Sequence, residues 1–215
     1  MISNKIKNKA YLSLLLTVFL TMKLLPMKAQ DYKTADEAKG LEVDVVAPMF
    51  SALTEDSTEF SLDEALEKGP VVMIFYRGFW CPVCNKHLSQ IQDSLKMIEK
   101  TGAKVIAVSP EKPEYLDKMA EKTGAEYTLV YDVGYKISDA YDVTFRPSAA
   151  TLVTYNTMLG AKLKKTNSDD SQRLPIPATY IIGTDGKIVW RHFDPDYKNR
   201  STVKDILIFL SEYDF

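Results

Sequence analysis

The fold of this 215-residue chain is decided by one stretch, Val71-Val72-Met73-Ile74-Phe75-Tyr76-Arg77-Gly78-Phe79-Trp80-Cys81-Pro82-Val83-Cys84. Its first half is continuously apolar, β-branched and aromatic, which is typical of a strand that is covered on both faces. From Pro82 to about residue 100, apolar residues recur three and four positions apart and predict an amphipathic helix that ends near Gly102. The two cysteines are therefore expected where a buried strand passes into a helix. That context separates a redox C-x-x-C motif from a chance one.

The segments on either side predict an α/β fold with a mixed central sheet and helices on both faces. Strands alternate with helices after the motif, and Gly183-Thr184-Asp185-Gly186 then reads as the turn of a hairpin. This order gives a sheet that is partly parallel and partly antiparallel. Further strands are expected at 104–108, 128–131, 178–182 and 187–191, a small hairpin closing at 59–60, and helices at 61–67, 113–122 and from 203 onward.

Residues 31–215 suit a single domain, because no repeat or long linker divides them. An insertion at about 132–176 separates the third and fourth predicted strands. It is expected to hold a helix at about 147–163, followed by a polar, mobile loop at 167–172. If the fold is right, the insertion lies near the cysteines, where it shapes substrate access or a dimer contact; a surface elaboration is the alternative.

Residues 1–30 are predicted to be a secretory signal peptide. Lys5, Lys7 and Lys9 precede an apolar run over residues 10–22, with cleavage expected near Ala29 or Gln30. The run is shorter than the roughly 20 residues that a membrane-spanning helix needs, so no stable membrane anchor is expected. The sequence therefore predicts an exported protein, located in the periplasm.

The charge of the mature chain argues against one class of partner. Removal of residues 1–30 takes away five of the 27 basic residues and none of the 29 acidic ones, which leaves a net charge of −7. Nucleic acid is therefore not expected as a partner.

The only two cysteines, Cys81 and Cys84, are expected to carry the chemistry. A disulfide that closes so short a loop stabilises the fold very little, so a purely structural bridge is the weaker interpretation. At a helix N-terminus Cys81 should be the attacking thiolate, with Pro82 setting the first turn. Cys84, one turn later, is then the resolving thiol.

A metal-binding or metal-delivery module is an alternative function. Cys81, Cys84, His87 and His192 are the only cysteines and histidines, and four such ligands could complete a zinc or copper site. Nothing in the sequence brings His192 near the others, so no metal and no other cofactor is predicted. Haem attachment would need a histidine directly after Cys84, where Asn85 stands.

Four segments carry a family resemblance: Phe75 to Asn85, Ala47-Pro48-Met49-Phe50, Pro177-Ala178-Thr179-Tyr180 and His192-Phe193-Asp194-Pro195-Asp196-Tyr197. Together they resemble the peroxiredoxin-like branch of the thioredoxin superfamily, within the alkyl hydroperoxide reductase and thiol-specific antioxidant family. The resemblance covers about residues 40–213 and implies a thioredoxin-like fold. It also implies a thiol-dependent antioxidant enzyme that reduces hydroperoxides through Cys81, is resolved by Cys84, and is recycled by an external dithiol such as a thioredoxin-like protein.

The resemblance also implies roles for Ile176 and Pro177. In thioredoxin-like proteins a cis-proline at this strand faces the C-x-x-C motif, and the backbone of the residue before it pairs with an extended substrate. Pro177 is the candidate, with Pro175 the weaker one, while an ordinary trans proline at the strand edge stays open.

Two positions depart from the family pattern. Typical peroxiredoxins carry threonine or serine three residues before the reactive cysteine and proline four residues before that, where this chain has Gly78 and Ile74. The departure keeps open a second function, a periplasmic thiol-disulfide oxidoreductase that acts on protein disulfides.

Side chains around the motif are expected to support the thiolate. A guanidinium beside Cys81 would lower its pKa, and Arg77 is the nearest candidate in the sequence. Arg146, Arg173 and Arg191 compete with it, and the sequence does not choose among them. Trp80 and Phe79 are expected to pack beside the nucleophile and control access to it.

Overall fold

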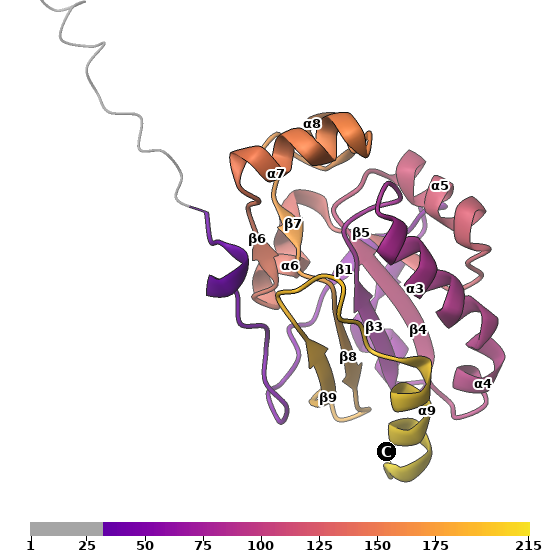
Figure 1. Cartoon of the computed structure of the whole chain (residues 1–215). Coiled ribbons are helices and arrows are strands. Elements are labelled where there is room, and N and C mark those ends of the chain that lie inside the picture. Colours follow the sequence, from indigo (N-terminus) through magenta and orange to yellow (C-terminus); the bar gives the residue numbers. More distant parts are fainter. Residues whose placement is uncertain (1–31) are drawn as a thin grey trace, which may run out of the picture. The chain divides into compact units, whose positions relative to one another are not determined.

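The computed structural model describes residues 32–215 (Figure 1). The predicted signal peptide lies outside the described residues. Among the helices of the described part, none is both long enough and apolar enough to cross a membrane.

A five-stranded mixed sheet forms the centre of the described part (Figure 1). Its strand order is β5-β4-β3-β8-β9, with β3 parallel to β4 and β4 parallel to β5. β8 runs antiparallel to β3 and to β9, which confirms the predicted mixed sheet. The bounds are β3 Val71–Phe75, β4 Lys104–Ser109, β5 Thr128–Tyr131, β8 Ala178–Ile182 and β9 Ile188–Phe193.

Helices cover both faces of this sheet because alternate residues of each strand point to opposite sides. Val72 and Ile74 of β3 belong to one apolar core, whereas Met73 and Phe75 belong to the other. The first core contains α3 (Pro82–Asp93), α4 (Leu95–Glu99), α5 (Pro113–Thr123) and α9 (Val203–Glu212). The second contains α2 (Leu62–Leu66), α6 (Lys136–Ala140) and the hairpin of β1 (Ser51–Leu53) with β2 (Glu59–Ser61), while a short turn, η2 (Ala35–Glu37), precedes them.

The helix expected over 82–100 is two helices. Ser94 leaves the helical conformation at φ −111° and ψ 4°, and its N–H donates to Ile91 O, so α3 ends and α4 begins at this residue. α3 still carries the predicted apolar stripe, with Cys84, Leu88 and Ile91 buried.

The insertion follows β5 and contains more elements than the single predicted helix. That helix is α7 (Ala149–Val153), which passes into a π-helical turn, η4 (Thr154–Met158). Leu159 N–H donates to Thr154 O, the i to i+5 bond of a π-helix. The other elements are η3 (Val133–Tyr135), α6, β6 (Thr144–Phe145), α8 (Leu163–Thr166) and β7 (Leu174–Pro175), with β6 and β7 forming a two-stranded antiparallel sheet.

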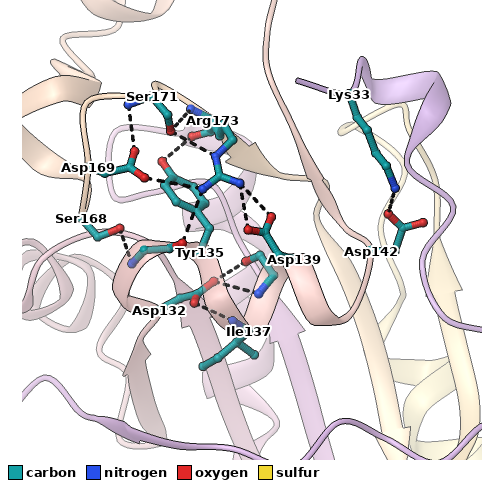
Figure 2. A network of polar contacts seen from close by, with 12 residues as sticks. Lys33, Asp132, Tyr135, Ile137, Asp139, Asp142, Ser168, Asp169, Ser171 and Arg173 are labelled. Carbon is teal, nitrogen blue, oxygen red and sulfur yellow. Dashed lines mark hydrogen bonds and ion pairs between the residues drawn. The ribbon is translucent and has the colours of Figure 1, made fainter. Parts of the chain in front are cut away.

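A polar network fixes the base of the insertion (Figure 2). Asp132 accepts hydrogen bonds from the N–H groups of Ile137 and Ser138 at 2.8 and 2.9 Å, and from the Ser138 hydroxyl. Tyr135 donates to Arg173 O at 2.7 Å and accepts from the fully buried Asn167 at 2.8 Å. Asn167, the first residue of the loop predicted to be mobile at 167–172, therefore belongs to this network through its side-chain amide.

Candidate active site

Cys81 lies at the junction of β3 and α3, as the sequence predicts. It is the N-cap of α3: its Sγ accepts the Cys84 N–H at 3.3 Å. Pro82 is the first residue of the helix, where its missing N–H costs no hydrogen bond. The positive end of the helix dipole therefore points at the Cys81 sulfur.

The two cysteines are free thiols, and neither exposes any surface. The Cys84 Sγ donates to the Cys81 Sγ at 2.7 Å. Two arginines flank the pair: Arg77 Nη2 donates to the Cys81 sulfur at 3.0 Å, and Arg200 Nη2 contacts the Cys84 sulfur at 3.4 Å.

Thiols this close titrate as a coupled pair. Burial raises the pKa of both thiols. The hydrogen bond between the two sulfurs and the charges of Arg77 and Arg200 lower the pKa of the first ionisation of the pair, and the negative charge then present raises the pKa of the second. One proton leaves the pair readily and the other is retained, which leaves a single negative charge.

The hydrogen bonds favour Cys81 as the sulfur that carries this charge. Its Sγ accepts from Arg77, from the Cys84 N–H and from the Cys84 thiol. Bonds from an ionised donor are the strong ones, and Arg77 makes the closer guanidinium contact of the two. This arrangement supports the assignment of Cys81 as nucleophile.

Arg77 is held in place by aromatic side chains. Its side chain is 2% exposed, and its Nη1 donates to the Tyr155 hydroxyl at 2.8 Å. The guanidinium carbon lies 5.2 Å from the centre of the buried Trp80 ring and 3.8 Å from that of Tyr197. Trp80 therefore packs against Arg77, which in turn donates to the Cys81 sulfur.

The structure separates Arg77 from the other arginines that the sequence offered. Arg173 pairs with Asp139 at 2.9 Å, and Arg191 pairs with Glu42 at 2.9 Å. Arg146 lies over the ring of Tyr32. These partners belong to the insertion and the N-terminal segment, so Arg77 is the candidate that reaches Cys81.

Sequence reasoning missed Arg200, Tyr155 and Tyr197. Arg200 is 116 positions from Cys84 along the chain, and no spacing rule connects the two. Tyr197 lies within the segment His192 to Tyr197 that carried part of the family resemblance, which was its only signal. Tyr155 was expected on a helix of the insertion, with nothing to direct it at Arg77.

Glu111 is a further missed residue, and it explains the glycine at position 78. Gly78 has φ +150°, and a Cβ there would lie 2.5 Å from Glu111 Oε1 and 2.5 Å from Trp80 Nε1. Glu111 is fully buried and accepts the Phe79 N–H at 2.8 Å. Burial raises the pKa of Glu111 well above the usual carboxyl value, and the hydrogen bond from the Phe79 N–H opposes this rise.

The expectation of a cis peptide at Pro177 is wrong, since residues 32–215 contain no cis peptide bond. Ile176 and Pro177 are buried at the start of β8, and the Ile176 N–H donates to Val143 O at 2.7 Å. Its neighbour Pro175 pairs with Thr144 in the sheet of β6 and β7. The insertion thus occupies the backbone donor that was expected to meet an extended substrate.

The histidines do not join the cysteines in a common site. His87 is buried, its Nε2 lies 3.3 Å from the Ser201 hydroxyl, and burial followed by the charge of Arg200 lowers its pKa to about 4. His192 lies on β9, where it pairs with Thr179 of β8. Within residues 32–215, no three His, Cys, Asp or Glu side chains are grouped so that they could hold a metal ion.

A pocket of about 450 Å³ opens beside the first turns of α3. Pro82 and Val83 form its apolar wall, and Arg200, which contacts Cys84, lies at its other side. Lys86, His87, Gln90 and Lys198 complete the lining. The pocket provides open space next to the otherwise buried cysteine pair.

Comparison with known proteins gives a consistent match. The family model described as the AhpC/TSA family matches residues 43–191. Peroxiredoxin Bcp of Escherichia coli K12 is 26% identical over 168 residues, which are 78% of this chain and 94% of that protein. The chloroplastic peroxiredoxin Q of Gentiana triflora is 36% identical over 98 residues, 46% of this chain and 45% of that protein.

Solved structures show the same fold. Peroxidoxin BcpB from Mycobacterium tuberculosis superposes with a TM-score of 0.63 at 20% identity, over 81% of this chain and 99% of that one. A peroxiredoxin-like protein from Aquifex aeolicus gives 0.61 at 20% identity, over 81% and 88%. The thioredoxin-like fold implied by the sequence resemblance is thereby confirmed.

Proposed function

This chain belongs to the AhpC/TSA family, and we propose that it reduces hydroperoxides through Cys81, with Cys84 as the resolving thiol and an external dithiol as reductant. Its relatives named peroxiredoxin support the activity class, a thiol-dependent peroxidase. The observation that carries the finer assignment is the Arg77 hydrogen bond to the Cys81 sulfur at a capped helix start.

In the first step the Cys81 thiolate attacks the terminal oxygen of the hydroperoxide. A sulfur–oxygen bond forms, the oxygen–oxygen bond breaks, and the alkoxide leaves and takes up a proton as the alcohol. Cys81 becomes a sulfenic acid while the peroxide is reduced. Arg77 favours this step because it stabilises the thiolate form of Cys81 at neutral pH.

In the second step Cys84 attacks the Cys81 sulfur. A disulfide forms, and the hydroxyl of the sulfenic acid leaves as water together with the proton of the Cys84 thiol. The two sulfurs are 2.7 Å apart before reaction, so this step requires little rearrangement. An external dithiol, of the thioredoxin-like kind, then returns two electrons and two protons by disulfide exchange.

Stopped-flow kinetics on the Cys84→Ser protein tests both assignments. Hydrogen peroxide should oxidise Cys81 much faster than a free thiol at the same pH, and a dimedone-type probe should trap a sulfenic acid on Cys81. The wild-type protein should instead form the Cys81–Cys84 disulfide. Oxidation at the rate of a free thiol would contradict the proposal.

The alternative functions lack a supporting observation. A protein-disulfide oxidoreductase would pair its substrate with the Ile176 backbone, and that N–H is already bonded to Val143. A metal module would need His87 or His192 beside the cysteines. His87 Nε2 instead lies against the Ser201 hydroxyl, and His192 on β9 pairs with Thr179 of β8.

We also propose that the protein is exported, with the periplasm as its compartment. The support is the basic and then apolar pattern of residues 1–30. Cell fractionation with N-terminal sequencing of the mature protein tests this, and an intact Met1 on cytoplasmic protein would contradict it.

A further inference from the structure

Cys81 cannot meet a substrate in the closed arrangement seen here. Its exposed fraction is 0%, and Arg77 above it is only 2% exposed. Trp80, 5% exposed, packs against the same guanidinium. A group that covers these residues must therefore move before a hydroperoxide reaches the sulfur.

Tyr155 is the side chain of the insertion that closes this site. Its hydroxyl accepts from Arg77 at 2.8 Å, and its ring lies 5.0 Å from the Trp80 ring at an angle of 41°. The same guanidinium donates to the Cys81 sulfur from its other amino group. Tyr155 thus touches both residues that cover the thiolate.

The hydrogen bond fixes the chemistry of this contact. Burial, opposed by Arg77, raises the pKa of Tyr155, so the phenol keeps its proton and accepts through its oxygen. The cation is then anchored on one side by a neutral acceptor and on the other by the thiolate. A guanidinium held in this way has a single orientation over Cys81.

Tyr155 lies on a turn with an exposed outer side. η4 is a π-helical turn between α7 and Gly160, which has φ +67°. Val153 is 63% exposed and Met158 81%, while Leu152 is buried in the core at 7%. Asn156 of the same turn is held by hydrogen bonds with Gln172 and with the Leu163 N–H.

We propose that Tyr155 is a positioning and specificity-determining residue: it orients Arg77 over Cys81, and its ring sets the size of the hydroperoxide that reaches the sulfur. This inference rests on the proposed function, because it names which hydroperoxides the site takes. Small peroxides reach the sulfur after a small displacement of the ring, whereas bulky aromatic ones require η4 to move away from Trp80.

Two substitutions separate the two roles. Tyr155→Phe keeps the ring and removes the acceptor of Arg77, so the thiolate pKa should rise and peroxide oxidation at pH 6 should slow about 3- to 10-fold. Tyr155→Ala removes the cover, and the ratio of cumene hydroperoxide to hydrogen peroxide rates should rise by about 10-fold or more. Met158→Ala, on the exposed side of the same turn, is the matched control and should leave this ratio as in wild type.

A second measurement makes the inference independent of peroxide chemistry. Alkylation of Cys81 by iodoacetamide and by a bulky aromatic maleimide, across pH 5–9, reports thiolate pKa and access without any hydroperoxide. Tyr155→Ala should favour the bulky reagent, and Tyr155→Leu, which keeps apolar packing, serves if the alanine protein does not fold. The inference would be overturned if the variant that lacks the Tyr155 ring gave wild-type values for two rate ratios. These are the ratio of cumene hydroperoxide to hydrogen peroxide and the ratio of the maleimide to iodoacetamide. A wild-type protein that alkylates as expected but ignores peroxide would contradict the proposed function instead.

Discussion

Two buried polar clusters of the described part differ in how completely they are hydrogen-bonded. In the network at the base of the insertion, Asp132, Tyr135 and Asn167 all have partners (Figure 2). Around the cysteines, Trp80 Nε1 and Glu111 Oε1 are buried without a hydrogen-bond partner among residues 32–215. Unpaired buried polar atoms cost stability, so a protein retains them where they serve a purpose.

The difference assigns the clusters separate tasks. The network of Asp132 holds the insertion in shape, whereas Arg77 and its neighbours surround the two thiols. Substitutions in the first should therefore change stability and leave the thiols unaltered. Substitutions in the cluster around Cys81 should change the titration of the thiols and leave the free energy of unfolding nearly unaltered.

The largest effect is expected for Asp132→Ala. It removes the acceptor of three hydrogen bonds and leaves the N–H groups of Ile137 and Ser138 buried and unpaired. The free energy of unfolding should fall by about 3 kcal/mol, measured by urea denaturation. Thiolate absorbance at 240 nm against pH should match that of wild type, and a shifted thiol titration would contradict the separation of tasks.

The second prediction concerns His87, whose pKa is lowered to about 4 by burial and by Arg200. The unfolded chain binds the proton near pH 6.5, so stability is full above that pH and is lost as the pH falls toward 4. The loss attributable to this group is roughly 3 kcal/mol. His87→Gln should remove that part of the pH dependence, with Lys86→Gln on the same helix as control. Equal slopes for wild type and His87→Gln between pH 6.5 and 4 would refute it.

The third prediction concerns reactivity: Arg77→Met should change the rate of Cys81 oxidation, by a smaller free energy than the two changes in stability above. Without the cation the thiolate pKa of the pair rises, so the rate of Cys81 oxidation at pH 6 should drop about 30-fold, equivalent to about 2 kcal/mol. The drop should shrink as the pH rises, because the thiol then ionises without help. Arg77→Lys keeps the charge but not the forked geometry and should lie in between. A pH-independent drop would mean that Arg77 acts in some other way.

The smallest effect is expected for Lys33→Ala at the edge of the insertion. Lys33 forms an ion pair with Asp142, and their side chains are 53% and 31% exposed. Exposed pairs contribute about 0–1 kcal/mol, so the urea midpoint should hardly change. A loss comparable to that of Asp132→Ala would show that the network extends to this pair.

The sequence was sufficient for the central sheet because its strands are local patterns. Val71–Phe75 and Ala178–Ile182 are buried on both faces and read as strands without knowledge of their neighbours. The glycine-rich turn between β8 and β9 and the helix after the cysteines follow in the same way. What periodicity did not show was the break at Ser94, since the apolar stripe continues across it.

The site was only partly predictable because its contacts join distant segments. Cys81, Cys84 and Pro82 follow from the motif itself, but the choice of Arg77 among four arginines needed the structure. Arg200 lies in the loop after β9, and Tyr155 lies in the π-helical turn η4. No short-range sequence pattern relates either residue to the cysteines. The expectation of a cis peptide at Pro177 was wrong; it came from the family resemblance and had no local sequence pattern behind it.

The sulfur of Cys81 is also the cap of α3, and this joins oxidation to the mechanical state of the helix. The reduced sulfur accepts the Cys84 N–H, a contact of the kind that contributes about 1 kcal/mol to a helix. A disulfide would take the negative charge from that acceptor, so we expect the first turn of α3 to be less stable in the oxidised protein than in the reduced one. Hydrogen exchange at the backbone amide of Cys84 would then be faster after oxidation.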